Sequence, residues 1–154
     1  MKKKSVIAIN LCLIASIVTL FGNKIYMLNI GDCHQLWEEA QTHYVNRQYE
    51  KARELLEKIA RIDTAHHAQY LTGDMYLKGL GGEIDYDKAL KLFHQSAAGG
   101  NTYAENNIGF MYTYGLGVTK DYSQAFKWLN NAASRGSPEE QIGMGRLYNN
   151  GWGV

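Results

Sequence analysis

Apolar side chains recur along this chain with the spacing of α-helices. Between residues 49 and 62 they fall at intervals of three and four, which predicts a helix with one apolar face. These residues are Ala52, Leu55, Leu56, Ile59 and Ile62. A preceding helix is expected to start near Cys33, because Asp32 can cap it. Its apolar residues are Leu36, Trp37, Ala40 and Tyr44. With the short break at residues 46–48, residues 33–65 form a predicted helix–turn–helix unit.

The rest of the chain repeats itself every 36 residues. Gly73, Gly109 and Gly145 occupy equivalent positions in three successive segments. Further positions keep the same register: Tyr76, Tyr112 and Tyr148; Gly79, Gly115 and Gly151; Asp85 and Asp121. Self-similarity at such a period is typical of solenoids. It defines repeats at 66–101 and 102–137 and a partial repeat at 138–154.

Each repeat is expected to contain two helices joined by a glycine turn. Gly79 and Gly115 fit the left-handed position that follows a helix C-terminus. Asp85 is placed to cap a helix over 86–98, and Asp121 one over 122–134. Asp121 and Gln124 also have capping-box spacing. Small residues recur where neighbouring helices must approach closely: Gly73, Gly109, Ala89, Ala125, Ala97 and Ala133.

Residues 1–22 have the pattern of a targeting segment. Three lysines precede an apolar run from Val6 to Phe21, as in a signal peptide or an uncleaved signal anchor. Both alternatives place the following domain outside the cytoplasm, because the lysines stay on the cytoplasmic side. The protein is therefore expected to be periplasmic or secreted. If the segment is not cleaved, residues 6–22 would anchor it in the inner membrane. A third alternative is a helix buried in the fold. Residues 23–32 form a linker.

Composition limits the classes of function. The chain has 154 residues, 45% hydrophobic and 20% charged, which is ordinary for a globular domain and argues against disorder. Its net charge of +1 gives no electrostatic footprint for nucleic acid. Two cysteines, Cys12 and Cys33, cannot form a multi-bridge framework. In an oxidising compartment Cys33 would be a lone thiol that bridges two chains or is reactive. The alternative is a small buried hydrophobe near the first helix.

No catalytic or metal-binding constellation stands out. His66 and His67 with Asp74 invite a metal hypothesis, but adjacent histidines at a helix start point in different directions and no third ligand has diagnostic spacing. His34, His43 and His94 have no partner at catalytic spacing. Neither a Ser-His-Asp set nor a phosphate loop can be argued. We therefore expect no enzyme, no metal and no cofactor.

Two motifs in the third unit suggest a family. Residues 109–118 follow Gly-x-Met-Tyr-x-x-Gly-Leu-Gly-Val, and residues 120–136 follow Lys-Asp-Tyr-x-x-Ala-x-x-Trp-Leu-x-x-Ala-Ala-x-x-Gly. The pattern resembles Sel1-like repeats, relatives of the tetratricopeptide repeat, whereas residues 33–65 resemble a tetratricopeptide unit. The resemblance implies an all-α, right-handed α/α solenoid that serves as a protein-binding scaffold. The paired cysteines of some relatives are lacking, so their disulfide chemistry is not carried over.

In solenoids of this kind the first helix of each pair lines the concave surface. The repeat register then assigns the following residues to that surface: Trp37, Gln41, Tyr44, His67, Tyr70, Asp74, Lys78, Tyr103, Asn106, Phe110, Tyr114, Ile142 and Arg146. Aromatics interleaved with amides and single charges suit a bound peptide or protein edge. The alternative is that Tyr70 and Phe110 belong to the core.

The partial repeat 138–154 has a predicted helix and turn but no second helix. Either the chain is truncated relative to longer relatives, or this end packs on a partner, with Trp152 exposed and contributing to binding. The leading hypothesis is an extracytoplasmic scaffold that binds another protein or peptide. A narrower form is an immunity or inhibitor protein for an exported effector. The alternative is a hydrolase acting on cell-wall material, as has been suggested for cysteine-rich relatives.

Overall fold

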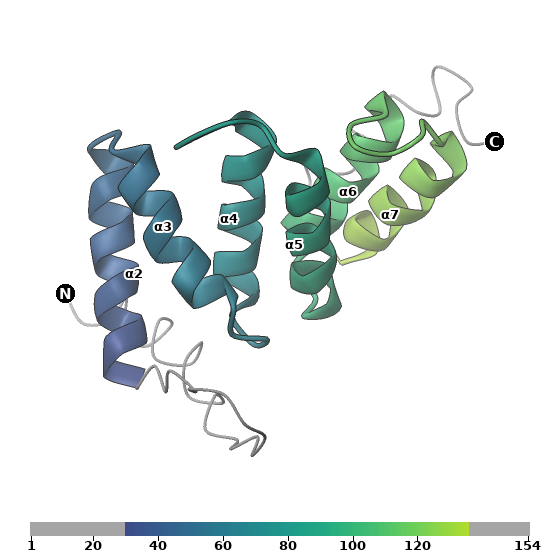
Figure 1. Cartoon of the computed structure of the whole chain (residues 1–154). Helices are drawn as coiled ribbons and strands as arrows, with labels where there is room; N and C mark the ends of the chain where they lie inside the picture. Colours follow the sequence, from purple (N-terminus) through teal and green to yellow (C-terminus); the bar gives the residue numbers. More distant parts are fainter. Residues whose placement is uncertain (1–29, 136–154) are drawn as a thin grey trace, which may run out of the picture.

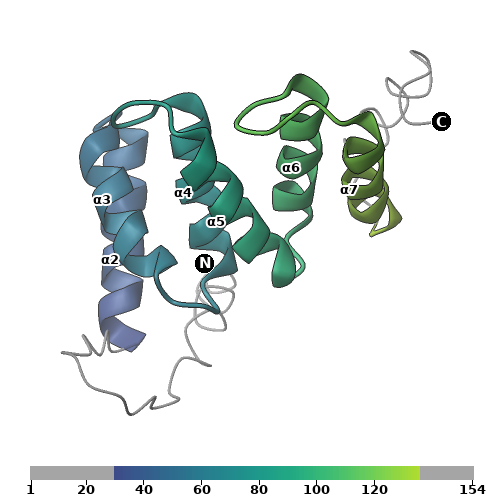
Figure 2. The same ribbon diagram turned by 45° about the vertical axis from the view of Figure 1, so that its right-hand side comes forward.

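The computed structural model describes residues 30–135, which form six α-helices and no strand. Their bounds are α2 Ile30–Val45, α3 Tyr49–Ala60, α4 His66–Lys78, α5 Tyr86–Ala98, α6 Thr102–Tyr114 and α7 Tyr122–Ser134. Each helix packs against the helices before and after it in the chain, most extensively within the pairs α2–α3, α4–α5 and α6–α7. The three pairs follow one another in a row (Figures 1 and 2). The predicted all-α solenoid is thereby confirmed.

The second helices of the two repeats start at aspartate caps, as predicted. Asp85 accepts a hydrogen bond from the backbone N–H of Lys88 at 3.0 Å, and Asp121 accepts one from that of Gln124 at 2.9 Å. The cap residues' own N–H groups donate to the carbonyls of Tyr76 and Tyr112 in the preceding helices, at 3.1 and 3.0 Å. The backbone of Asp121 is therefore engaged with α6, and this bond ties the turn to the first helix of the pair.

Two predicted helix ends differ from the structure. Helix α2 begins at Ile30, not near Cys33, so Asp32 lies in its first turn and is not its cap. A carboxylate there still interacts favourably with the positive end of the helix dipole. Helix α3 ends at Ala60, two residues before the predicted Ile62, because the chain turns there: the N–H of Ile62 bonds to the carbonyl of Ile59 at 3.0 Å.

Within each repeat the two helices approach closely at a glycine. A methyl group on Gly73 would lie 2.8 Å from a ring carbon of Phe93, and one on Gly109 would lie 2.7 Å from Cγ of Leu129. Both contacts are far shorter than normal van der Waals distance. The 36-residue repeat of these glycines therefore reflects the packing of α4 on α5 and of α6 on α7.

Buried polar side chains connect neighbouring helices, both between repeats and within one. The buried amide of Gln69 on α4 donates to the carbonyls of Ala60 and Ile62 at the end of α3, at 3.4 and 3.1 Å. Within the repeat 66–101, the hydroxyl of Ser96 on α5 donates to the carbonyl of His66 at the start of α4. The Gln69 bonds satisfy carbonyls at the C-terminal end of α3, which lack a partner inside the helix.

None of the helices α2 to α7 is long and apolar enough to cross a membrane. The apolar run from Val6 to Phe21 lies outside the described residues, as does the predicted partial repeat at 138–154.

Candidate functional site

Helices α2, α4 and α6 each expose one side to solvent. We name this side, with the predicted binding residues that it carries, the first-helix face. All eleven predicted binding residues of the described part lie on these three helices. Four of them are large aromatic side chains with 40–54% of their surface exposed: Tyr44, Tyr103, Phe110 and Tyr114. Val45 and Ile84 complete the set of exposed large hydrophobic residues between residues 32 and 135.

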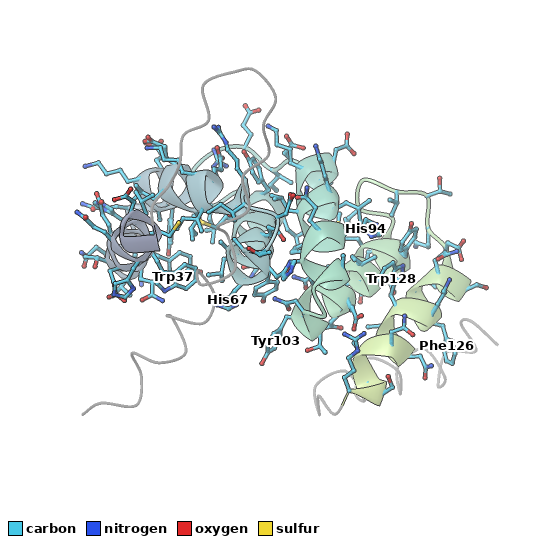
Figure 3. The ribbon with its side chains drawn as sticks, turned by 90° about the horizontal axis from the view of Figure 1, so that it is seen from below. Trp37, His67, His94, Tyr103, Phe126 and Trp128 are labelled. Carbon is cyan, nitrogen blue, oxygen red and sulfur yellow. The ribbon has the colours of Figure 1, made fainter. Side chains whose placement is uncertain are left out.

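Aromatic rings on the first-helix face form a continuous row across the three helices. The ring centroids of Trp37 and His67 are 5.3 Å apart, those of His67 and Tyr70 6.2 Å, and those of Tyr70 and Tyr103 5.7 Å. Figure 3 shows Trp37, His67 and Tyr103 along one edge of the molecule. We name Trp37, His67, Tyr70 and Tyr103 the aromatic row. It brings together residues that lie 66 positions apart in the sequence.

Tyr70 joins the aromatic row to the core. It is half-buried, and its ring lies 6.2 Å from that of the fully buried Phe93 on α5. The prediction assigned no role to Phe93, although its equivalence to Leu129 one period later marks it as a core position. Phe110 behaves differently, because it is exposed and pairs with the exposed Tyr114 at 4.5 Å. Phe110 is thus a surface residue.

The charged residues of this face form an ion pair. The ammonium of Lys78 lies 2.8 Å from the carboxylate of Asp74, one turn away on α4. The side chain of Asp74 is 14% exposed and that of Lys78 57%. Burial raises the pKa of the Tyr70 phenol, and the negative charge of Asp74 raises it further. Burial also lowers the pKa of His67.

The remaining predicted residues make no ring contact or ion pair among those described above. Gln41 is exposed and Asn106 is half-buried. Ile142, Arg146 and Trp152 lie outside the described residues, so their assignment remains a prediction.

The two adjacent histidines make different contacts. Nδ1 of His66 lies 3.2 Å from Oε1 of Gln69, whereas the ring of His67 packs between Trp37 and Tyr70. Within residues 30–135 no group of three or more His, Cys, Asp or Glu side chains is arranged to hold a metal ion. Cys33 is 3% exposed and is therefore a buried thiol.

A second polar arrangement, away from this face, has a structural role. The Tyr76 hydroxyl donates to Glu57 at 2.6 Å, and the cationic groups of Arg53 and Lys88 lie 4.8 and 5.0 Å from the centre of its ring. These residues come from α3, α4 and α5, so the Tyr76 ring ties adjacent repeats together. A further ring contact joins His94 on α5 to Trp128 on α7, at 5.2 Å (Figure 3). Sequence reasoning found neither arrangement.

The fold and the first-helix face together define an α-helical repeat scaffold. The family model described as Sel1 repeat matches residues 27–62, 66–101 and 102–137, and the chain therefore belongs to the Sel1 repeat family. Its first match covers most of the unit that resembles a tetratricopeptide repeat. Proteins of this family generally mediate protein–protein interactions on a scaffold that is typically non-catalytic.

Two solved structures show the same architecture. The crystal structure of a Sel1 repeat protein from Oxalobacter formigenes is 30% identical, with a TM-score of 0.69 over 77% of this chain and 48% of that one. The structure of c5321, a protective antigen of uropathogenic Escherichia coli strains with an SLR fold, is 27% identical, with a TM-score of 0.69 over 80% and 27%. This chain thus spans half or less of either protein. The curated proteins gave no significant match.

Proposed function

We propose that this protein binds another protein or a peptide along its first-helix face. The observation that supports this proposal most strongly is the exposure of aromatic rings there. Tyr103, Phe110 and Tyr114 each have 44–54% of their surface exposed to solvent. Other residues of α6 form the buried side of this helix, so the three rings are not part of it. Exposed aromatic rings that cluster on one face favour an interaction surface.

Rigid aromatic side chains are well suited to this role. They supply large contact areas while few rotatable bonds lose freedom on binding, and Tyr and Trp are enriched among the residues that dominate interface energies. The aromatic row crosses α2, α4 and α6. An occupant that contacts all of the row must therefore lie across the repeats, as an extended segment or a protein edge does.

The narrower form of the proposal is an extracytoplasmic immunity or inhibitor protein for an exported effector. The sequence of residues 1–22, in which lysines at positions 2–4 precede an apolar run, supports the extracytoplasmic location in this proposal. A reporter enzyme that works only outside the cytoplasm, fused after Val154, should be active. Activity of the corresponding cytoplasmic reporter would contradict this location.

The binding function can be tested with one variant and one matched control. Full-length protein is first used as bait to capture a partner from periplasmic extract and from exported proteins. The affinity of the captured partner is then measured for the variants Tyr103→Ala and Ile84→Ala. Both substitutions remove an apolar side chain that is 52% exposed, but Ile84 lies in the α4–α5 turn. We expect Tyr103→Ala to weaken binding about tenfold or more, with Ile84→Ala unchanged. Equal binding by both variants would place the interface elsewhere.

A further inference from the structure

Asp74 is a carboxylate on the first-helix face, close to the half-buried ring of Tyr70. It lies on α4 one turn from Tyr70, whose ring contacts Tyr103 of α6 at 5.7 Å. Burial raises the pKa of the Tyr70 phenol, and the negative charge of Asp74 raises it further. The spacing of four residues on α4 and the ring contact with α6 therefore place Asp74, Tyr70 and Tyr103 on the same face. A negative charge beside exposed ring faces is a setting that attracts a cation.

An internal cation already occupies this carboxylate. The Lys78 ammonium lies 2.8 Å from Oδ2 of Asp74, but its side chain is more than half exposed and comes from the last turn of the same helix. The carboxylate is largely buried, with 14% of the Asp74 side chain exposed, whereas Lys78 is a flexible side chain whose ammonium returns to solvent when it leaves the pair. A cation supplied by a partner can therefore compete with Lys78 for Asp74, and the contact of Lys78 shows that a cationic side chain reaches this carboxylate from the surface.

Among biological cations the arginine guanidinium fits best. It is planar, stacks on aromatic faces and forms two parallel hydrogen bonds to one carboxylate, whereas a lysine ammonium acts as a hydrated point charge. We propose that the first-helix face receives an arginine side chain of the bound partner, paired with Asp74 and stacked on the rings of Tyr70 and Tyr103. This inference rests on the proposed function and specifies the chemistry of the partner: a segment that contains arginine.

The test uses a small probe whose charge can be removed without a change of shape. Full-length protein is titrated with N-acetyl-argininamide and with N-acetyl-citrullinamide, its neutral isostere, while NMR follows the ring signals of Tyr70 and Tyr103. We expect saturable shifts of both rings with the arginine probe and binding about tenfold weaker with the citrulline probe, because the charge-assisted bond is lost.

Three variants locate the site. Asp74→Asn should weaken binding of the arginine probe about tenfold, since it keeps the shape but removes the charge. Asp63→Asn removes an exposed carboxylate in the α3–α4 turn and should change nothing. Lys78→Met should tighten binding by about twofold, because the internal competitor is absent. Circular dichroism checks the fold of each variant, and the citrulline comparison needs no variant.

Equal binding of the two probes, or no saturable shift of either ring, would overturn the arginine assignment. Equal affinity of Asp74→Asn and Asp63→Asn would overturn it as well. The function proposed above fails separately, if Tyr103→Ala keeps full affinity for the captured partner. A third outcome is that Tyr103→Ala loses affinity for the partner but the arginine probe does not bind. This result would support the binding face and exclude only the proposed recognition of arginine.

Discussion

The carboxylate of Glu105 on α6 lies 3.6 Å from the guanidinium of Arg135, which directly follows α7. Both residues depart from the repeat, because the same register positions one period earlier hold Gln69 and Gly99. The Glu105 side chain is 5% exposed, and its Oε2 has no hydrogen-bond partner within the described residues. A buried carboxylate has thus replaced a buried amide, and a cation at the end of the next helix accompanies it.

This relationship predicts coupled effects on stability. Arg135→Ala should lower the free energy of unfolding by about 1–2 kcal/mol, because it leaves a buried carboxylate without its cation, although Arg135 is half exposed. Glu105→Gln should be neutral or stabilising, since it restores the amide found at Gln69. In the Glu105→Gln background, Arg135→Ala should have no further effect. Urea denaturation measures all four proteins. An equal cost of Arg135→Ala in both backgrounds would contradict the pairing.

Two glycines in the α6–α7 turn provide a matched comparison. Gly115 and Gly117 both have positive φ, +70° and +67°, as was predicted for Gly115. The nearest neighbours of a methyl group on Gly115 would be 3.4 Å away, but a methyl group on Gly117 would lie 2.6 Å from Cβ of Tyr86. Gly115→Ala should therefore lose about 1 kcal/mol, from backbone strain alone. Gly117→Ala should lose about 1–3 kcal/mol more.

Thermal unfolding followed by circular dichroism can separate the two glycine variants. Equal losses would mean that the α6–α7 turn does not pack on the start of α5. The same comparison with Gly115→Val, which adds a branched side chain at the left-handed position, should lower the melting temperature further than Gly115→Ala.

The lowered pKa values of two histidines should make the free energy of unfolding depend on pH. Burial lowers the pKa of both His67 and His94 below the ordinary value of about 6.5. The unfolded chain therefore binds protons at a higher pH than the folded chain does. Stability from these residues is fully present above about pH 7 and falls as the pH drops through 6.5 toward the folded pKa values. The variants His67→Gln and His94→Gln should each flatten this decline, and an unchanged pH profile would contradict the burial.

The repeat pattern predicted the helices best where caps and terminators are local. The bounds of α5 and α7 agree with the prediction because an aspartate side chain starts each helix by binding a backbone N–H three residues on. Asp32 misled the prediction, since an aspartate is equally favourable within a first turn. The α2–α3 connection spans three residues whereas the α4–α5 and α6–α7 connections span seven, so the first repeat falls out of the 36-residue register.

The contacts of the candidate site were less predictable. The register assigns Trp37, His67 and Tyr103 to first helices, but their distances depend on the rotation between successive repeats, which no local pattern fixes. Packing of Tyr70 on Phe93 likewise depends on where α5 lies against α4. The ion pair of Glu105 and Arg135 could not be predicted from the repeat. Alignment of the repeats identifies positions that hold the same residue, and these two positions hold different residues in successive repeats.

The central claim is that the exposed rings of the first-helix face bind a partner and do not hold the domain together. Phe110 and Tyr114 test it most directly, because they are 44% and 54% exposed and contact each other at 4.5 Å. The decisive measurement is the affinity of Phe110→Ala and Tyr114→Ala for the captured partner, alongside their melting temperatures. We predict that each variant loses about 1–3 kcal/mol of binding free energy while its melting curve and circular dichroism spectrum stay unchanged. Normal affinity together with loss of folding would show that these rings are core residues and would contradict the account.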